Sequence, residues 1–424
     1  MNAPSPAVAH YRDVFERVRP SLRGSPARRA AAFARFSELG FPGPREEAWK
    51  YTSLRRLEAR RFAAPAESAA AVPPALHATR LLVTNGRPAA PLPASLAGFN
   101  LRTLAEAPSD ETNALRALPG LGTERFAALN AALSGEPLLL EMPAGAASDD
   151  VLALTLHTSG EVATLANPRV VVRMGPGSRG RLLLDYTDDG GAEHFTNAVL
   201  DVELAAHAEL TVYRLHRPGD RAFHVERVEA RLAEAACFVM RDSQFGGSLS
   251  RLDLHVSLDG RGARTEVTGV FLADGARHLD THALIEHRAI ETTSLQDYRG
   301  IAAHKGRGVF NGKSIVHEGA QKSNARQVNR NLLLTPGAEI DTKPDLEIYA
   351  DDVQCSHGAT TGQLDPAAMF YLRSRGLDEA QARSALTRAF AGAVLSKVDD
   401  PTLSGYVHDV LDARLARLLD EVGE

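Results

Sequence analysis

The order of hydrophobic and polar positions begins with a helical segment. Residues 5–62 favour helix, and the firmest part is the Ala-rich run 27–39. Ser25-Pro26 offers a capping hydroxyl followed by proline at the first helical position, and Gly40 is a typical stop. The pattern therefore predicts an N-terminal helical domain over residues 1–65.

The middle of the chain changes to short β-type runs. An Ala/Pro-rich stretch, residues 63–74, is typical of a linker, and residues 81–86 predict a short strand and turn. Further on, apolar runs of strand length are separated by Gly, Asp and Pro. We therefore expect a mixed connecting region over residues 66–149 and a β core over residues 150–358.

The β region carries a weak internal repeat. An aliphatic residue or Met is followed four positions later by Ala or Ser in the pairs Met174/Ser178, Leu204/Ala208, Leu232/Ala236, Leu272/Ala276, Val316/Ala320 and Leu334/Ala338. Recurrent turns of one shape suggest stacked coils, as in a β-helix, where each rung buries its inner face against its neighbours. Because the spacing is irregular, the pattern alone leaves a sandwich or barrel as an alternative.

Residues 359–424 return to a helical pattern. Asp365-Pro366 and Asp400-Pro401 are helix starts, and Gly376 is a stop. Between them, a predicted helix over residues 380–398 has one small, apolar face, made of Ala382, Ala385, Leu386, Ala389 and Ala393. We expect this face to pack on its own domain, with an exposed docking face for a partner as the alternative.

Composition and charge narrow the class of protein. The 424 residues are 44% hydrophobic and 24% charged, as in ordinary folded, soluble proteins. A net charge of -5 argues against nucleic acid or an anionic membrane as partner. We find neither an apolar run of about 20 residues nor a signal peptide, so we expect a cytoplasmic protein whose partners are proteins or small species.

The two cysteines, Cys237 and Cys355, are too few for a disulfide framework or for a four-thiolate metal site within this chain. Cys237 follows a run of small residues and is predicted to be a buried hydrophobe. The segment Gly175–Gly180 matches GxGxxG, but a strand-like run follows it where a nucleotide site needs a helix N-terminus. We therefore predict a turn between strands there, and no Walker A sequence supports nucleotide binding elsewhere.

Three histidines, His278, His282 and His287, lie within ten residues. On a straight strand the first two share one face and the third lies on the other, which makes a regular three-His metal site awkward. We expect structural or surface histidines, with a metal role as the lesser alternative.

The sharpest constellation is the pair Cys355 and His357. Before it, residues 345–351 alternate polar and apolar side chains, as a half-buried strand does. If that register continues, both residues share the outward face with the acids, with Cα atoms roughly 6–7 Å apart. Two ligands do not complete a metal site, so a structural pair, a metal- or cluster-handling pair and a catalytic dyad all stay open at this point.

The segment around Cys355 and His357, together with several others, is similar to a known protein family. The chain resembles the SufD branch of the SufB/SufD family, which belongs to the SUF iron–sulfur cluster assembly complex. The similar segments are Arg45–Leu54, Asn329–Leu334, Pro344–Ile348, Cys355–Thr360, Gly362–Asp365 and Phe370–Gly376. The SufB branch is the alternative. It is typically longer and has an acidic residue after its Cys-x-His motif, where this chain has Gly358.

The resemblance implies a mainly β fold, with a right-handed parallel β-helix core flanked by N-terminal and C-terminal α-helical regions. It also implies a noncatalytic scaffold that pairs with SufB through the β-helices and docks the SufC ATPase on its C-terminal helices, with a homodimer as the alternative state of the isolated chain. His357 and Cys355 would then be transient metal ligands at the cluster-assembly interface, completed by the partner chain. A nascent iron–sulfur cluster would be held transiently, and no cofactor would be bound tightly by this chain alone. The competing class is a β-helix enzyme with a Cys/His site.

Overall fold

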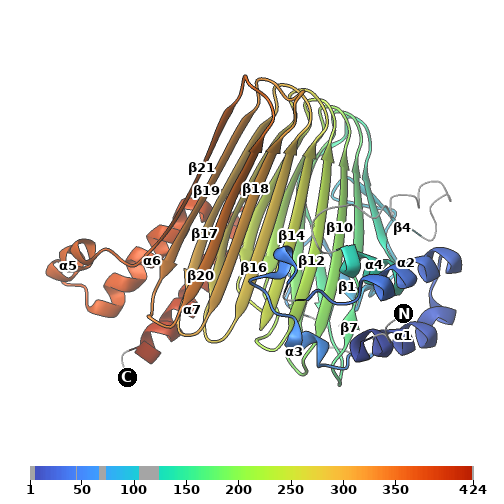
Figure 1. The fold of residues 1–424 in the computed structure, drawn as a ribbon, viewed down its shortest axis with the longest axis horizontal. Coiled ribbons are helices and arrows are strands. Elements are labelled where there is room, and N and C mark those ends of the chain that lie inside the picture. The colour runs from blue at the N-terminus through green and yellow to red at the C-terminus, as the bar shows by residue number, and fades with distance from the viewer. Residues whose placement is uncertain (1–4, 44, 66–72, 105–123, 423–424) are drawn as a thin grey trace.

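A computed structural model describes residues 5–43, 45–65, 73–104 and 124–422. Its main body is a parallel β-helix, in which successive strands from β8 to β21 alternate between two sheets (Figure 1). This arrangement confirms the predicted mainly β fold with a parallel β-helix, and it rules out the sandwich and barrel alternatives. The ten-stranded sheet contains β1 (Arg80–Thr84), β2 (Arg87–Pro88), β6 (Ala147–Thr158), β9 (Arg179–Asp188), β11 (Glu209–His216), β13 (Cys237–Gln244), β15 (Arg264–Ala273), β17 (Thr293–Ala302), β19 (Asn324–Leu333) and β21 (Gln354–Gly362).

The eleven-stranded sheet forms the second wall of the solenoid. Its first strands, β3 to β5, are joined by antiparallel pairing, and the later ones are parallel. It contains β3 (Ser95–Leu96), β4 (Phe99–Thr103), β5 (Leu138–Met142), β7 (Leu165–Ala166), β8 (Arg169–Met174), β10 (Phe195–Leu204), β12 (Phe223–Leu232), β14 (Leu249–Leu258), β16 (His278–His287), β18 (Arg307–Val316) and β20 (Glu339–Ile348).

A recurrent turn from the eleven-stranded to the ten-stranded sheet accounts for four of the six pairs of the weak repeat, Met174/Ser178, Leu204/Ala208, Leu232/Ala236 and Val316/Ala320. At each of four successive rungs a residue with φ between 53° and 69° bridges the two sheets, namely His207, Ala235, Gly262 and Glu291. In this left-handed conformation each backbone N–H donates to a carbonyl in the turn of the next rung, at 2.8 to 3.1 Å. The equivalent turn between β8 and β9 covers residues 175–178, so the turn predicted at Gly175–Gly180 is confirmed, with its last two residues in β9.

The interior of the solenoid is mainly apolar and contains a buried charged network. Arg214 on β11 donates to Glu226 at 2.6 Å and to Asp242 at 2.8 Å, and all three side chains are fully buried. Tyr186 and His224 also contact Glu226, at 2.6 and 3.2 Å. The network therefore joins several rungs across the core.

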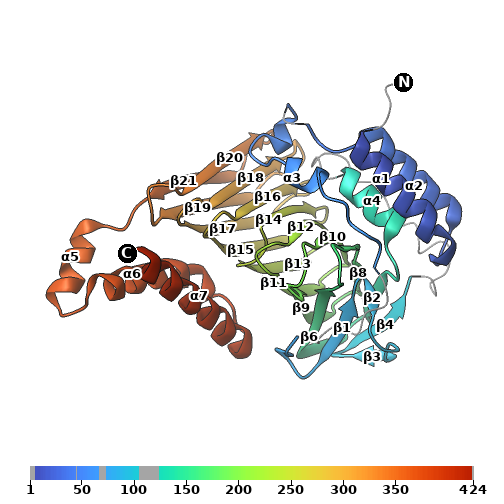
Figure 2. The same cartoon turned by 90° about the horizontal axis from the view of Figure 1, so that it is seen from below.

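The N-terminal helices cover one end of the eleven-stranded sheet (Figure 2). The predicted helix is α2, which Ser25 caps and Gly40 ends with φ 60°. Trp49 lies 3.9 Å from the guanidinium of Arg251, and the hydroxyl of Thr52 donates to Asp280, so the Arg45–Leu54 segment fastens this region to the solenoid. The elements are α1 (Pro6–Val18), η1 (Arg19–Ser21), α2 (Pro26–Leu39), η2 (Glu47–Trp49), α3 (Arg55–Glu58) and α4 (Glu124–Leu133). Part of the predicted linker, residues 66–72, lies outside the described residues.

The C-terminal helices are α5 (Pro366–Ser374), α6 (Glu379–Leu395) and α7 (Pro401–Val422). Helices α5 and α7 start at the predicted Asp-Pro positions, and α6 starts at Glu379 after the capping residue Asp378. The packed face of α6 agrees with the predicted one at Ala382, which is buried, and differs from it further along the helix. Ala389 and Ala393 are exposed, whereas Ala391, Val394 and Leu395 are buried against the solenoid and α7. The larger aliphatic side chains bury more apolar area than alanine does, and they set the orientation of the helix. None of the helices in the described ranges is both long and apolar enough to span a bilayer.

Candidate functional site

Cys355 and His357 lie on β21, the last strand of the ten-stranded sheet. The structure corrects the expectation of one strand continuing from the acidic residues. Strand β20 ends at Ile348, the chain turns over residues 349–353, and β21 begins in the opposite sheet. We call β20 and β21 the last rung. Each pairs on one side with the preceding rung and has no strand partner on the other among the described residues.

The two side chains face into the solenoid, whereas the sequence predicted an outward face. Cys355 is aligned with Ala325 on β19 and packs against the buried cluster that contains Val316 and Ala350. His357, two residues further, lies on the same face. It is nevertheless exposed, because no further rung covers the end of the solenoid. The imidazole is therefore accessible from the open end of the β-helix.

The surroundings of the pair consist of a half-buried thiol and of acids that are paired with a lysine. Burial raises the pKa of the Cys355 thiol, although a backbone hydrogen bond with Ala325 opposes the shift, so the thiol is protonated at neutral pH. The nearby acids are engaged elsewhere, since Lys313 forms ion pairs with Asp345 at 3.7 Å and with Glu347. In the part of the chain that the structure describes, no group of three His, Cys, Asp or Glu side chains is arranged to hold a metal ion.

The three clustered histidines do not form one site. His278 and His282 lie on the outer face of β16, where His278 is 2.8 Å from the hydroxyl of Thr52 and His282 is 3.1 Å from Asp280. His287 lies on the inner face, 2.8 Å from the hydroxyls of Thr292 and Ser294, and burial lowers its pKa to about 4. The predicted division between the two faces is confirmed. Each histidine has a hydrogen-bond or ion-pair partner within the fold.

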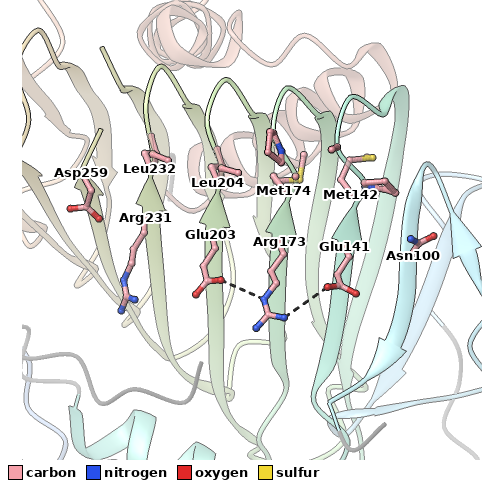
Figure 3. Close-up of a pocket in the computed structure, with 16 residues that line it drawn as sticks. Asn100, Glu141, Met142, Arg173, Met174, Glu203, Leu204, Arg231, Leu232 and Asp259 are labelled. Atoms are coloured by element: carbon pink, nitrogen blue, oxygen red, sulfur yellow. Dashed lines mark ion pairs between the residues drawn. The ribbon is translucent and has the colours of Figure 1, made fainter. Parts of the chain in front are cut away.

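Two other features lie away from the last rung. Cys237 begins β13 and is half-buried, not fully buried as predicted, because it lies on the outer face of the strand, whereas Phe238 and Met240 point into the core. A shallow depression of about 700 Å³ lies along the ends of β5, β8, β10 and β12. Figure 3 shows that Arg173 reaches towards Glu141 on one side and Glu203 on the other, at 3.8 and 3.4 Å, so these charges pair with one another. Neither Cys355 nor His357 lines this depression.

Sequence reasoning missed the polar residues directly beneath the pair. Gln327 on β19 is aligned with His357, is 1% exposed, and has no hydrogen-bond partner for either amide atom. Asn329 and Asn331 follow on the same face and are also buried. Their period of two was present in the sequence, but alternating polar residues ordinarily indicate the solvent face of a strand.

Comparisons with known proteins identify the family of this chain. Residues 156–390, more than half of the chain, match the family described as SUF system FeS cluster assembly, SufBD core domain. The chain is 29% identical over 384 residues to the iron–sulfur cluster assembly protein SufD of Escherichia coli, covering 89% of this chain and 90% of that protein. It is also 29% identical over 409 residues to a SufBD family protein of Synechocystis, covering 91% and 90%.

A third relative, the chloroplastic protein ABCI7 of Arabidopsis thaliana, is 33% identical over 235 residues, covering 55% of this chain and 50% of that protein. The parallel β-helix, its helical flanks and these matches together place the molecule: the chain belongs to the SufBD family of the SUF iron–sulfur cluster assembly system.

Proposed function

We propose that this chain is a noncatalytic scaffold subunit that pairs with a SufB-type partner through its last rung. The observation that carries the proposal is the open end of the solenoid, where Cys355 and His357 lie together on an unpaired edge strand. An exposed edge with unpaired backbone groups is a template for adding a strand from another chain. Pairing there would cover the site and bring partner side chains next to His357. A homodimer through the same edge is the alternative state of the isolated chain.

The chemistry of cluster assembly fits a site divided between two chains. Nascent iron–sulfur species need thiolate and imidazole ligands, and this chain would offer the Cys355 thiol, which loses its proton when it binds a metal, and the His357 imidazole at the interface. With two donors from this side, a partner thiolate would complete the ligand set, and the incomplete set on each chain favours release of the product. The cluster is thus cargo, and this chain holds no cofactor of its own in the proposal.

The C-terminal helices supply a docking surface for a SufC-type ATPase in this proposal. Helix α5 has no buried residue and extends away from the solenoid strands (Figures 1 and 2). It exposes two aromatic side chains, Phe370 at 75% and Tyr371 at 56%. Large exposed aromatic residues on one helix are typical of an interface. Because the sequence carries no nucleotide motif, ATP hydrolysis is assigned to the docked subunit.

Changing the two aromatic residues of α5 should separate docking from folding. We expect the double variant Phe370→Asp/Tyr371→Asp to bind the SufC-type ATPase at least ~30-fold more weakly, about 2 kcal/mol, because both anchors are replaced by charges. Its thermal midpoint should be unchanged, since α5 buries nothing. Ala367→Asp on the same helix, also exposed, is the matched control. Isothermal titration with the ATPase measures the change, and wild-type affinity in the double variant would contradict this docking surface.

Removing the imidazole should reduce cluster formation without disturbing assembly of the complex. We expect His357→Ala to lower the iron and sulfide recovered per complex at least ~10-fold, because a ligand of the shared site is lost. Cys355→Ala should have a smaller effect if that side chain mainly supports the interface. Ser356→Ala, on the outer face of the same strand, is the control. Co-purification with the SufB-type partner from cells, followed by metal and sulfide analysis, tests the proposal. Loss of the complex itself in His357→Ala would instead indicate a structural histidine.

A further inference from the structure

Strands β20 and β21 end the solenoid with two free edges of different composition (Figure 2). Strand β21 contains no acidic residue, lysine, arginine or proline. Strand β20 contains Pro344 near its middle and a charged side chain at every second position. These charged residues are Glu339, Asp341, Lys343, Asp345 and Glu347. Prolines and charges are the features that keep strand edges from pairing with other chains, so β20 is built as a protected edge and β21 is not.

Pro344 removes a hydrogen-bond donor from the open side of β20. The N–H of Glu339 donates to Gly306 at 3.1 Å, and the N–H of Tyr349 donates to Val316 at 2.8 Å, both on the preceding rung. Because N–H groups alternate in direction along a strand, the odd-numbered residues of β20 face β18 and the even-numbered ones face the open edge. The missing N–H of Pro344 is therefore on the open edge, where its ring also stands in the path of an incoming strand.

The open edge of β21 offers a continuous row of donors by the same criterion. The N–H of Gln354 donates to Ser323 on the preceding rung, so the N–H groups of the alternate residues point to the open side. They belong to Cys355, His357, Ala359 and Thr361. On β20 the proline divides the corresponding row into two donors on either side. A strand that pairs along the whole edge can therefore form at β21 and not at β20.

We infer that the partner extends only the ten-stranded sheet, through β21, and that β20 remains a free edge past which iron, sulfide and the finished cluster reach and leave the shared site. This inference rests on the proposed function and adds to it the kind of partner and the route of the cargo. The partner needs to offer one edge strand, not two. Since Cys355 and His357 face into the solenoid end, a strand added to β21 covers them from that side, and the side next to β20 stays open to solvent.

Hydrogen exchange of the full chain in its complex with the SufB-type partner distinguishes the two edges. We expect the amides of residues 354–362 to exchange at least ~10-fold more slowly in the complex than in the isolated monomer, because a new strand takes up their open-edge N–H groups. The amides of residues 339–348 should exchange at the same rate in both. Protection of both segments would overturn the inference and leave the proposed function standing. Absence of protection at residues 354–362 would contradict both.

A second proline on the edge of β20 tests the same point through affinity. The N–H of Thr342 points to the open edge, so Thr342→Pro removes a donor there and keeps the ladder with β18. We expect this variant to bind the partner within about twofold of wild type, because no strand pairs at β20. Thr342→Ala, which keeps the N–H and shortens the side chain, is the matched control, and titration calorimetry measures both.

A loss of affinity of ~10-fold or more in Thr342→Pro but not in Thr342→Ala, at an unchanged thermal midpoint, would show that β20 is paired and would overturn the inference. If Thr342→Pro lowers the thermal midpoint, the exchange rates of residues 339–348 in the wild-type complex decide the question.

Bulk on the inner face of β20 tests the route itself. Thr342 lies on the inner face and Asp341 on the outer face, so Thr342→Trp and Asp341→Trp add the same side chain on opposite sides of the free edge. After reconstitution of the complex with iron and sulfide, we expect Thr342→Trp to slow the removal of cluster iron by a ferrous chelator ~10-fold or more, with partner affinity unchanged. Asp341→Trp should behave as wild type. Removal at the wild-type rate in both variants would place the route elsewhere and overturn the inference.

Discussion

Replacing Arg214 with methionine is expected to lower the free energy of unfolding by about 3–5 kcal/mol, because it leaves buried acids without their counter-ion. Although burial opposes its ionisation, the charge of Arg214 and a hydrogen bond with His224 lower the pKa of Glu226 to about 2, so this residue is a carboxylate at neutral pH. Burial raises the pKa of Asp242, which accepts hydrogen bonds from Arg214 at 2.8 Å and from Gln244 at 2.7 Å. Methionine fills similar volume but supplies no charge and no donor.

Urea unfolding of the full chain, followed by circular dichroism, measures this loss. Arg179→Met is the matched control, because its ion pair with Asp149 is solvent-exposed and is expected to contribute less than 1 kcal/mol. The triple variant Arg214→Met/Glu226→Gln/Asp242→Asn should recover part of the loss, since it removes the uncompensated charges together with the arginine. A loss below 1 kcal/mol in Arg214→Met would show that water or rearranged side chains replace the guanidinium.

Local chemistry made several elements predictable from the sequence. The bounds of α2 followed from Ser25-Pro26 and Gly40, and the turn at Gly175–Gly180 from the strand-like run after it. These features depend on residues close together in the chain. The parallel β-helix came from the family resemblance, because recurrent turns alone did not distinguish stacked coils from a sandwich.

The missed features depend on contacts between rungs. The inward face of Cys355 is set by the turn over residues 349–353, which moves the chain into the other sheet. The buried charges of Arg214 and Glu226 and the amide of Gln327 follow the same period of two as an outward polar face. Which face lies inward is decided by the strands on either side, about 30 residues away in sequence, and no local pattern records it.

The open edge of β21 can be blocked by a single substitution, and we expect this change to have a large effect on partner binding. Backbone N–H groups point to alternate sides along a strand, and the Gln354 N–H donates to Ser323 on the β19 side at 2.9 Å. The N–H of Ala359, five residues later, therefore points to the open edge of β21. Proline at this position removes an edge donor and places a ring where an incoming strand would lie, but it leaves the ladder with β19 intact.

We expect Ala359→Pro to weaken binding of the SufB-type partner at least ~30-fold, about 2 kcal/mol, with little change in the thermal midpoint of the isolated chain. Ala359→Val is the matched control, because it adds bulk on the inner face and keeps the N–H. Titration calorimetry of each variant with the partner gives the affinities, and the ATPase should bind all of them equally through α5. If Ala359→Pro is folded and binds the partner as tightly as wild type does, no strand is added at β21, and the interface lies elsewhere on the solenoid.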